Sequence, residues 1–555
     1  MTFENPIAST NNSIKLTDRN LTSFSADTDY SLWKATRNFR RAPIKPLPPL
    51  QIGSEWVRDD NVKVELYAQH LEKCFMPHDI ASPSLPPSQN LPDCQFSFSP
   101  KEVATVIDRL NVKKAPGADR ITARMLRELP RLRLLWLTRI YNSMLRLRYI
   151  PANWKRAKVI MLHKPGKQPN LIKSYRPISL LSVLNKVFEK LLHKKLLSLL
   201  PSTALPNHQF GFRAHHSTTD QLHRVTTTIL QSLEKKQFCA AAFLDVAQAF
   251  DRVWHAGLLY KIRCLLPSNV CDLLQNYLSN RTFFVTYGMY TSTTRPISAG
   301  VPQGSVLGPL LYSLFTADIP ATIDQTVVAT FADDTAFLAL SKDYLDSVNT
   351  LQGSLDIFHE WTTRWKIKVS SEKSTHVVYS LHPHGYQPVE FDRDIIPYAS
   401  SAKYLGVHLD ERLTFRQHIE RKRKELDLRL NKLRWLLHRR SALSISNKRL
   451  LYMATLRPVW AYALPIWGCA ANSLRNIIQR FQNKALRLIA GAPWYVRNDS
   501  LHADLRVPTI NEVIKKLSSK HERRLHYHPN ELALSLLDNS TSIRRLCRRH
   551  PVDLA

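Results

Sequence analysis

The sequence is poor in cysteine, and its cysteines form no recognisable ligand set. Seven are scattered through 555 residues: Cys74, Cys94, Cys239, Cys264, Cys271, Cys469 and Cys547. They form no C-x-x-C pair and no Cys/His block with zinc spacing, which argues against a zinc module or a disulfide scaffold. We therefore expect free thiols in a reducing compartment.

Long apolar runs and a leader sequence are also missing. No apolar run approaches the roughly 18 residues that a membrane-spanning helix needs. The first thirty residues are polar, so no signal peptide is visible. No stretch matches G-x-x-x-x-G-K-[ST], which makes a P-loop motor a poor candidate. These absences predict a protein of the nucleus or the cytoplasm that does not enter a membrane.

Negative charge is scarce as well. Lys and Arg number 78 against 45 Asp and Glu, a net charge of +33. Such an excess opposes compact folding by self-repulsion and favours a polyanionic partner, with nucleic acid first and an anionic membrane surface second. Residues 402–555 hold 30 basic and 12 acidic residues, so +18 of this charge lies in a basic C-terminal region.

The length predicts two or three lobes, because one hydrophobic core rarely serves 555 residues. Prolines interrupt residues 1 to about 100, where only 61–74 has the pattern of an amphipathic helix. Ser99 and Pro100 then indicate a helix start. Further patterns predict a strand within 154–167, a hairpin within 398–410, and helices over 132–149, 186–200, 344–366 and much of the chain after Arg416. An apolar stripe in that last region is expected in the core: Leu426, Leu430, Leu433 and Leu437.

One carboxylate follows a candidate buried strand. Phe238–Leu244 is apolar and short, as a strand buried on both faces would be, and Asp245 comes directly after it. We expect a helical stretch over Ala247–Trp254. A strand-to-helix junction is a common place for a site, although a single carboxylate there is more often a helix cap.

Glycine is rare, yet it gathers in one segment. The chain has only 14 glycines, and residues 299–312 (AGVPQGSVLGPLLY) contain Gly300, Gly304 and Gly308. Glycine allows close approach of the backbone to a ligand. We expect a turn here that leads into a helix over Leu310–Phe315.

Two more carboxylates stand between apolar, β-prone runs in residues 327–340 (VVATFADDTAFLAL). A continuous strand would send Asp333 and Asp334 to opposite faces, whereas a tight turn would place both at the tip of a hairpin. A plain surface turn is the alternative. If Asp245 joins them, three carboxylates would repel one another unless cations neutralise them. Oxygen ligands of this kind suit two Mg²⁺ ions in phosphoryl transfer.

Six stretches in order carry a resemblance to a known family: SYRPISL (174–180), QFGFR (209–213), FLDVAQAFDRVWH (243–255), AGVPQGSVLGPLLY (299–312), FADDTAFLA (331–339) and KYLGVHLD (403–410). They resemble the reverse transcriptases of non-LTR retrotransposons of the LINE and jockey kind. LWKATR (32–37) and YALPIWG (462–468) extend the likeness.

The resemblance implies an α+β right-hand polymerase, with fingers, a palm built on an antiparallel sheet, and a helical thumb. It divides the chain into an N-terminal extension (1–98), a helical N-terminal part of the fingers (99–145), fingers and palm (146–409), and a basic thumb and C-terminal region (410–555). Nothing in residues 1–100 resembles the endonuclease with which the family's longer polyproteins begin. The chain is therefore expected to start where that domain would end.

The resemblance also assigns roles to residues. Asp245, Asp333 and Asp334 would be catalytic and, with the Val246 carbonyl, would bind two Mg²⁺ ions, for which Mn²⁺ could substitute. Nucleotide contacts would come from Arg213, Gln303, Gly304, Lys373 and Phe250, the last as a steric gate against the ribose 2′-hydroxyl. Tyr404, Leu405 and Gly406 would form the primer grip. The expected partners are an RNA template, a DNA primer or target, and deoxynucleotides.

Three positions depart from the family pattern, and other readings stay open. Gln248 stands where the family usually has Lys, and Ser370 and Ser374 replace the usual Asn and Thr around Lys373. An RNA-dependent RNA polymerase would also use a palm, but Phe250 and Ala332 argue against it. A catalytically inactive, nucleic-acid-binding remnant of such an element is the second alternative.

Overall fold

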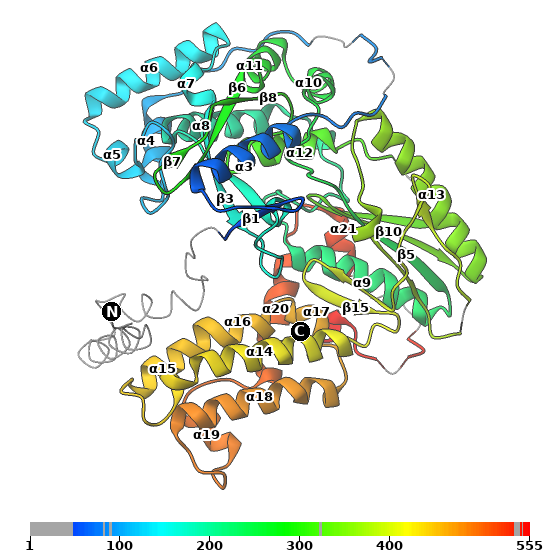
Figure 1. Ribbon diagram of the computed structural model, residues 1–555. Coiled ribbons are helices and arrows are strands. Elements are labelled where there is room, and N and C mark those ends of the chain that lie inside the picture. Colours follow the sequence, from blue (N-terminus) through cyan, green and yellow to red (C-terminus); the bar gives the residue numbers. More distant parts are fainter. Residues whose placement is uncertain are drawn as a thin grey trace.

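The computed structural model describes residues 48–81, 84–87, 91–320, 325–383, 385–537, 544–546 and 548–554. The LWKATR segment (32–37) and Cys547 lie outside these residues. The six cysteines that are described are all free, as expected. The chain forms a mixed arrangement of helices and sheets (Figure 1).

Four strands form an antiparallel sheet in the order β11-β5-β10-β9. Their bounds are β5 Phe238–Asp245, β9 Thr326–Phe331, β10 Asp334–Ser341 and β11 Thr375–Tyr379. Along β5, Ala240 and Ala242 pack into the core on one face, and Cys239 and Ala241 pack into the core on the other. A strand buried on both faces has no polar alternation, which explains the continuous apolar run. The predicted buried strand is confirmed.

Helices cover both faces of this sheet (Figure 1). α13 (Tyr344–Arg364) packs on β5 and β10, and its buried residues belong to the core of one face. α9 (Thr218–Glu234) packs on β5 and β9 from the opposite face. α9 begins at a capping box formed by Ser217 and Asp220, as the Ser-Thr-Thr-Asp sequence suggests. The ends of the central strands are thus supported from two sides.

A second sheet has the order β4-β3-β6-β7, with β8 paired to β6. Its strands are β3 Arg156–His163, β4 Tyr175–Leu180, β6 Arg281–Tyr287, β7 Tyr290–Thr291 and β8 Arg295–Ile297. α3 (Asp60–Cys74) lies over this sheet, where Tyr67 and Leu71 share a core with Val159 and Phe283. The helix predicted over 61–74 is confirmed. A short hairpin, β1 (Leu50–Ile52) and β2 (Glu55–Val57), precedes it.

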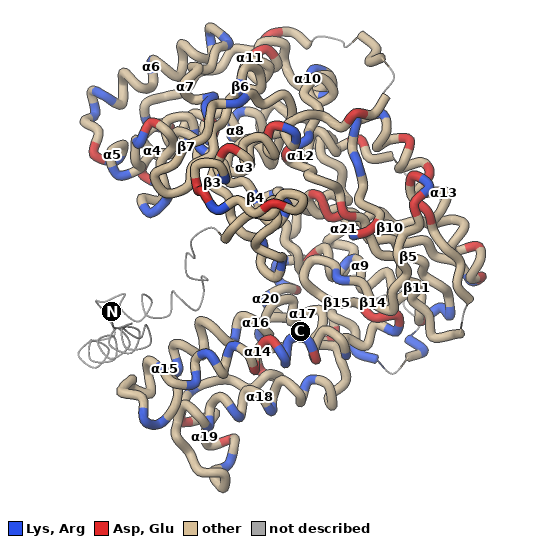
Figure 2. Tube along the Cα trace, viewed as in Figure 1, with Lys and Arg blue, Asp and Glu red and all other residues tan. Residues whose placement is uncertain are grey.

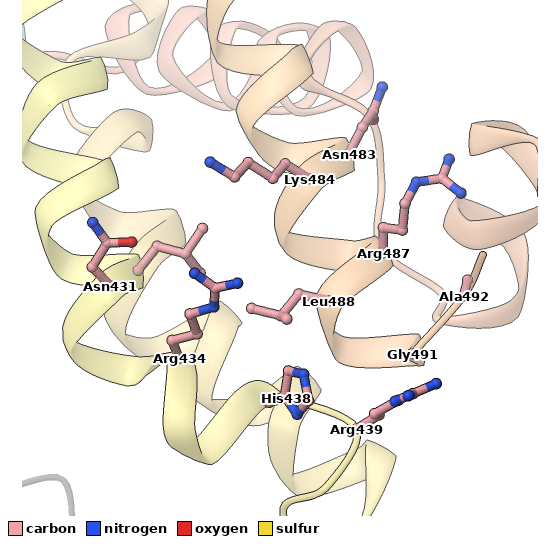
Figure 3. Close-up of a pocket in the computed structure, with 11 residues that line it drawn as sticks. Asn431, Arg434, His438, Arg439, Asn483, Lys484, Arg487, Leu488, Gly491 and Ala492 are labelled. Carbon is pink, nitrogen blue, oxygen red and sulfur yellow. The ribbon is translucent and has the colours of Figure 1, made fainter. Parts of the chain in front are cut away.

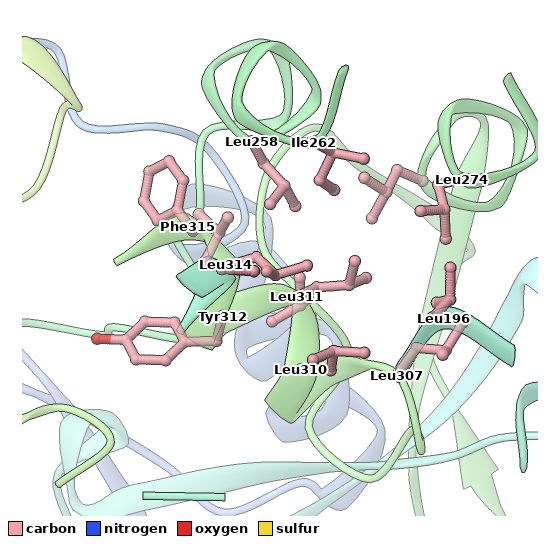
Figure 4. Packing of buried hydrophobic residues seen from close by; sticks show 14 of the residues in the cluster. Leu196, Leu258, Ile262, Leu274, Leu307, Leu310, Leu311, Tyr312, Leu314 and Phe315 are labelled. Carbon is pink, nitrogen blue, oxygen red and sulfur yellow. The ribbon is translucent and has the colours of Figure 1, made fainter. Parts of the chain in front are cut away.

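Helices around α12 (Gly308–Phe315) build most of the core on the α13 side. Leu258, Ile262 and Leu274 converge on Leu311 and its neighbours (Figure 4). The helices of this part are α4 Pro100–Asp108, α5 Ala123–Arg127, α6 Arg131–Leu147, α7 Ala152–Lys155, α8 Val183–Leu199, α10 His255–Arg263 and α11 Ser268–Leu278. α12 begins directly after the glycine-containing turn. Because α12 is packed in the core, it holds the end of that turn in place.

The C-terminal region is helical after two small hairpins. The hairpin strands are β12 Glu390–Phe391, β13 Asp394–Ile395, β14 Ser401–Tyr404 and β15 Val407–Asp410. The helices are α14 Arg416–Leu437, α15 Ile445–Leu451, a π-helical turn Tyr452–Leu456, α16 Arg457–Ala461, α17 Leu464–Trp467, α18 Asn472–Ala490, α19 Asn498–Asp504, α20 Ile510–Leu525 and α21 Glu531–Leu534. The predicted stripe on α14 is buried, so its assignment to the core is confirmed. Lys and Arg recur along α14 and α18 (Figure 2).

The last helices return to the four-stranded sheet. Leu525 of α20, Ala533 of α21 and Leu536 form a buried cluster with Phe210, against which Phe331 of β9 packs. The C-terminal region therefore also contributes to the surroundings of the β9–β10 hairpin. In the part of the chain that the structure describes, no helix is long and apolar enough to cross a membrane.

The helical stretch expected over Ala247–Trp254 is wrong. This segment is a series of turns, and the helix α10 starts only at His255. Gln248 has a φ of 53°, in the left-handed region, and the Ala247 N–H donates to the Lys368 carbonyl instead of entering a helix. The pairing with residues beyond α13 overrides the local helical pattern.

Candidate active site

Asp333 lies in the tight turn of a hairpin, and Asp334 begins its second strand. Phe331 of β9 pairs with Asp334 of β10, which leaves Ala332 and Asp333 as a two-residue turn. Ala332 has a φ of 59°, a conformation that a non-glycine residue rarely adopts. The hairpin is therefore the correct alternative, and the continuous strand is excluded.

Asp245 lies directly opposite Asp334. The register of β5 and β10 pairs these two residues at the ends of their strands. Side chains of directly opposed residues share one face of a sheet and lie about 5 Å apart at Cβ. The sheet thus brings together two carboxylates that are almost ninety residues apart in sequence, with Asp333 beside them in the turn.

Burial and neighbouring carboxylates raise the pKa values of Asp333 and Asp334. Desolvation by the surrounding protein, followed by the charges of Asp333 and Asp245, raises the pKa of Asp334 to about 6, although Asp334 is an exposed residue. Desolvation also raises the pKa of Asp333, with the Asp245 charge contributing in the same direction and Arg176 opposing it. A carboxylate group of this kind carries unbalanced negative charge that a cation would relieve.

Lys373 supplies part of that positive charge. Its Nζ lies 3.2 Å from Asp245 Oδ2. The two departures from the family pattern next to it hold the Asp245 backbone: the Ser370 N–H donates to the Asp245 carbonyl at 2.8 Å, and the Asp245 N–H donates to Ser374 Oγ at 3.2 Å. Serine at both positions is therefore compatible with an ordered site.

The donor set fits a hard divalent cation, although it is not gathered tightly. Among the described residues, no three His, Cys, Asp or Glu side chains are close enough together to form a ready-made metal site. Val246 pairs with Val369, and the hydrogen bonds on either side run from the Ala247 N–H to the Lys368 carbonyl and from the Ser370 N–H to the Asp245 carbonyl. These bonds do not use the Val246 carbonyl. Carboxylate and carbonyl oxygens are the ligands that Mg²⁺ prefers.

Two cations near the carboxylates were not assigned from the sequence. Arg176 of β4 acts on the Asp333 carboxyl, and Lys164 lies in a cluster with Arg176 and Lys373. Burial first, and then the Arg176 and Lys373 charges, lower the pKa of Lys164. Strand alternation in SYRPISL leaves Arg176 exposed between buried Tyr175 and Pro177, a signal that could have singled it out.

Phe250 is held in an aromatic group beside the carboxylates. Its ring stacks on Tyr312 at 4.6 Å between centroids and meets Phe212 edge-on at 5.6 Å. Tyr312 is buried, and burial together with the charges of Asp333 and Asp334 raises its pKa. The half-buried ring of Phe250 therefore has a fixed orientation near the acidic hairpin.

The glycine-containing turn is pressed against β4. The Ser179 N–H donates to the Gln303 carbonyl at 3.0 Å, and Gln303 Nε2 donates to Asp251 at 3.1 Å. Gly304 has a φ of 114°, and a Cβ there would lie 2.6 Å from the Ser179 carbonyl oxygen. Only glycine suits both the conformation and the contact.

A buried carboxylate that sequence reasoning missed anchors this turn. Glu189 of α8 is fully buried and accepts hydrogen bonds from the Val306 N–H, the Leu307 N–H and the Tyr277 hydroxyl. Burial raises the pKa of Glu189. Its position on an otherwise ordinary amphipathic helix gives no local signal of this role.

Arg213 does not point freely toward the carboxylates. Its Nη1 donates to the Pro206 carbonyl at 2.9 Å and to the Gln209 carbonyl at 3.3 Å, so the guanidinium holds the loop that precedes it. Burial lowers the pKa of Arg213. The structure therefore shows a loop-bracing contact for this residue.

Tyr404, Leu405 and Gly406 lie at the tip of the β14–β15 hairpin. Leu405 and Gly406 form its two-residue turn, with φ values of 44° and 80°, as a type I′ turn requires. Tyr404 is buried, and its hydroxyl donates to the Ala329 carbonyl of β9 at 3.4 Å. Tyr462, from the YALPIWG stretch, donates to the Leu405 carbonyl at 2.7 Å. This turn is thus attached both to the acidic hairpin and to the C-terminal helices.

Comparisons with known proteins agree with these features. Residues 162–409 match the family described as reverse transcriptase (RNA-dependent DNA polymerase). The chain is 42% identical over 551 residues to the probable RNA-directed DNA polymerase from transposon X-element of Drosophila melanogaster, covering 96% of this chain and 60% of that protein. It is 39% identical over 555 residues to the RNA-directed DNA polymerase from mobile element jockey of the same organism, covering 95% and 60%.

The chain spans about 60% of the length of the curated relatives it matches. Among solved structures, apo telomerase from Candida tropicalis gives a TM-score of 0.33 over 51% of this chain and 59% of that one, at 14% identity, which is too low to support an argument.

The carboxylate cluster should destabilise the metal-free protein at neutral pH. Because the pKa of Asp334 in the folded chain, about 6, lies above its ordinary value, the folded state binds the proton more tightly than the unfolded state. Stability is therefore lost as pH rises through that range. In EDTA at pH 7.5 we expect Asp334→Asn to raise the midpoint of thermal unfolding, and the gain should shrink toward pH 5.

The control for this measurement is Asp79→Asn, which changes an exposed aspartate after α3. This variant should leave the midpoint unchanged across the pH range. An Asp334→Asn midpoint at or below that of the unmodified protein at every pH would contradict the electrostatic account.

Proposed function

We propose that the protein, whose residues 162–409 match the reverse transcriptase family, is an RNA-directed DNA polymerase of a non-LTR retrotransposon. It extends the 3′-hydroxyl of a primer with deoxynucleotides on an RNA template. The observation that carries the proposal is the pairing of Asp245 with Asp334, beside Asp333 in a tight turn. Most of the chain's length, and not only this domain, is similar to polymerases of such elements.

Asp245, Asp333 and Asp334, with the Val246 carbonyl, would hold divalent metal ions. When bound, two Mg²⁺ ions, or Mn²⁺ in their place, would supply charge stabilisation at the attacking and leaving oxygens. The Lys373 ammonium, now paired with Asp245, would be released to the phosphates of the incoming nucleotide. The protein itself would position the reacting atoms, and Arg176 and Lys373 place positive charge beside Asp333 and Asp245.

The cations around the hairpin suit a triphosphate. We assign the phosphate contacts to Arg176, Lys164 and Lys373. Lys164 lies within electrostatic reach of the other two, of which Arg176 acts on Asp333 and Lys373 pairs with Asp245. Arg213 would add positive charge to the site without using Nη1 for a phosphate contact, because Nη1 already donates to the Pro206 and Gln209 carbonyls. Gln303 and Gly304 would lie under the nascent base pair.

Phe250 would select deoxyribose over ribose. Stacking on Tyr312 prevents its ring from swinging away, so a 2′-hydroxyl would have to displace the ring. A rigid ring is a better filter than a mobile side chain, because displacing it also breaks its packing.

The proposed division follows the predicted one. Residues 99–145 would complete the fingers, 146–409 would form fingers and palm with the four-stranded sheet at the palm, and 410–555 would form the thumb and C-terminal region. Tyr404, Leu405 and Gly406 would act as the primer grip, supported by the contact of Tyr404 with β9. A nuclear or cytoplasmic location would follow from the substrates.

A basic groove between α14 and α18 supports contact with nucleic acid. It has a volume of about 710 Å³ and is lined by Arg434, Arg439, Lys484, Arg487 and several neutral residues (Figure 3). The described residues that line it include no Asp or Glu, although Lys484 lies 4.0 Å from Asp427 outside the lining. Arg434 and Arg439 are exposed, so they could meet a phosphate backbone without rearrangement.

Primer extension tests the main proposal. The unmodified chain with Mg²⁺ should add deoxynucleotides to a DNA primer on an RNA template. Asp333→Ala and Asp334→Ala should each lower the rate by at least about 100-fold, since each removes a proposed ligand of the metal ions that stabilise the transition state. Asp79→Ala is the matched control and should retain the rate.

Persistence of incorporation in either site variant would refute the site assignment. No incorporation by the unmodified chain would favour an inactive remnant, and efficient use of ribonucleotides by it would favour an RNA polymerase.

Substitution of Phe250 tests the steric gate. Phe250→Ala should lower the preference for deoxynucleotides over ribonucleotides by about 10- to 100-fold, the range in which apolar pockets discriminate a hydroxyl. Phe250→Tyr keeps the ring and should keep the preference. The measurement is kcat/KM for each nucleotide, and unchanged sugar selectivity in the alanine variant would refute this role.

The salt dependence of template-primer binding tests the groove. Arg434→Ala with Arg439→Ala should flatten the slope of log Kd against log salt by up to about 2, because each lost phosphate contact removes about one counterion. The control pair, Arg124→Ala with Arg133→Ala, removes equal charge from exposed positions of α5 and α6. Equal slopes for the two pairs would show that the groove makes no specific contact.

A further inference from the structure

The open edge of β9 is covered by a segment from the QFGFR stretch. The Phe210 N–H donates to the Thr330 carbonyl at 3.0 Å, and the Thr330 N–H donates to the His208 carbonyl at 3.2 Å. Gln209 and Thr330 form an isolated parallel bridge. The segment therefore runs alongside the last strand of the sheet and reaches the hairpin turn.

At that turn the Gln209 side chain joins the two segments. Its Oε1 accepts hydrogen bonds from the Gly211 N–H at 2.7 Å and from the Ala332 N–H at 3.0 Å. Its Nε2 donates to the Ala332 carbonyl at 3.5 Å. Gln209 is 2% exposed, so water does not compete for these bonds. One amide thus satisfies both backbone groups of the residue that precedes Asp333.

The backbone contact here is as close as glycine permits. A Cβ on Gly211 would lie 2.2 Å from the Ala332 nitrogen. Ala332 itself has a φ of 59°, which alanine adopts only where its surroundings impose it. The hydrogen bonds from the Gln209 amide and the close backbone contact with Gly211 hold Ala332 in this conformation.

The C-terminal helices press this segment onto the hairpin. Phe210 is fully buried and packs with Leu525 and Leu536, and Phe331, on the hairpin side, packs against the same cluster. Residues on either side of the Gln209 contact are therefore held by one hydrophobic cluster. This packing restricts how far the turn can move away from the Gln209 amide.

We propose that Gln209 is a positioning residue that fixes the Ala332–Asp333 turn and, through it, the carboxylates of Asp333 and Asp334. It touches neither substrate nor metal. Its amide would keep the turn in one conformation while Asp333 and Asp334 bind metal ions and Lys373 leaves Asp245 for the nucleotide phosphates. This inference rests on the proposed polymerase function, in which those carboxylates are the metal ligands.

Gln209→Met tests the proposal, because methionine matches the length of glutamine and lacks the hydrogen-bonding amide. We expect kcat for RNA-templated primer extension to fall by about 10- to 100-fold, as for loss of other residues that orient metal ligands. KM for the deoxynucleotide and Kd for the template-primer should change less than about twofold, since the binding surfaces stay intact.

A second measurement does not depend on turnover. Addition of Mg²⁺ to the unmodified chain should raise its thermal midpoint, because metal binds the folded state. The Mg²⁺ concentration that gives half of this rise should increase by about 10-fold or more in Gln209→Met.

Gln221→Met is the matched control. Gln221 is also fully buried, and its Nε2 donates to the Thr330 carbonyl at 3.3 Å and to the His208 carbonyl at 3.4 Å, but to no group of the Ala332–Asp333 turn. It should lower the thermal midpoint as Gln209→Met does, while leaving kcat and the Mg²⁺ requirement nearly unchanged.

The outcomes separate this inference from the proposed function. If the unmodified chain does not incorporate deoxynucleotides, the proposed function fails. If it does, kcat and the Mg²⁺ requirement of Gln209→Met within twofold of the unmodified values would overturn the positioning role. Equal losses in Gln209→Met and Gln221→Met would also overturn it.

Discussion

Repulsion between carboxylates at one end of a sheet is the constraint on which the rest of the structure depends. The pairing of Asp245 with Asp334 follows from the register of β5 and β10, and a slip by one residue would turn one of them to the opposite face. Such a slip would also move small alanines such as Ala241 and Ala242 into the wrong cores. Burial of both faces therefore secures a register that the charges alone would oppose.

Some cations of the large basic surplus offset this repulsion locally. Lys373 pairs with Asp245, and Arg176 acts on Asp333 from the other sheet. These cations come from segments that are distant in sequence, so the two sheets must be correctly placed before the acidic cluster is tolerable. The same cations are then available to phosphates, because an ion pair in an exposed position costs little to exchange.

Features with a strong local signal could be predicted from the sequence. The buried strand Phe238–Leu244, the hairpin around Asp333 and the stripe on α14 each follow from a local pattern. The turns at Ala247–Trp254 could not, because the Ala247 N–H donates to the carbonyl of Lys368, a residue distant in sequence, and Gln248 lies in the left-handed region. Contacts made by Glu189 and Arg176 were missed for the same reason, since each depends on a chain segment more than a hundred residues away.

Contacts between segments that are distant in sequence also connect the C-terminal region to the four-stranded sheet. The turn of β14 and β15 is fastened by Tyr462, which also donates to Thr218 at the start of α9. Asp220, in the first turn of α9, is fully buried and forms an ion pair with Arg524 of α20. A charge buried in this way is stable only while its partner stays in place. The C-terminal region is thus joined through α9 to the hairpin that carries Asp333 and Asp334, and movement of one constrains the other.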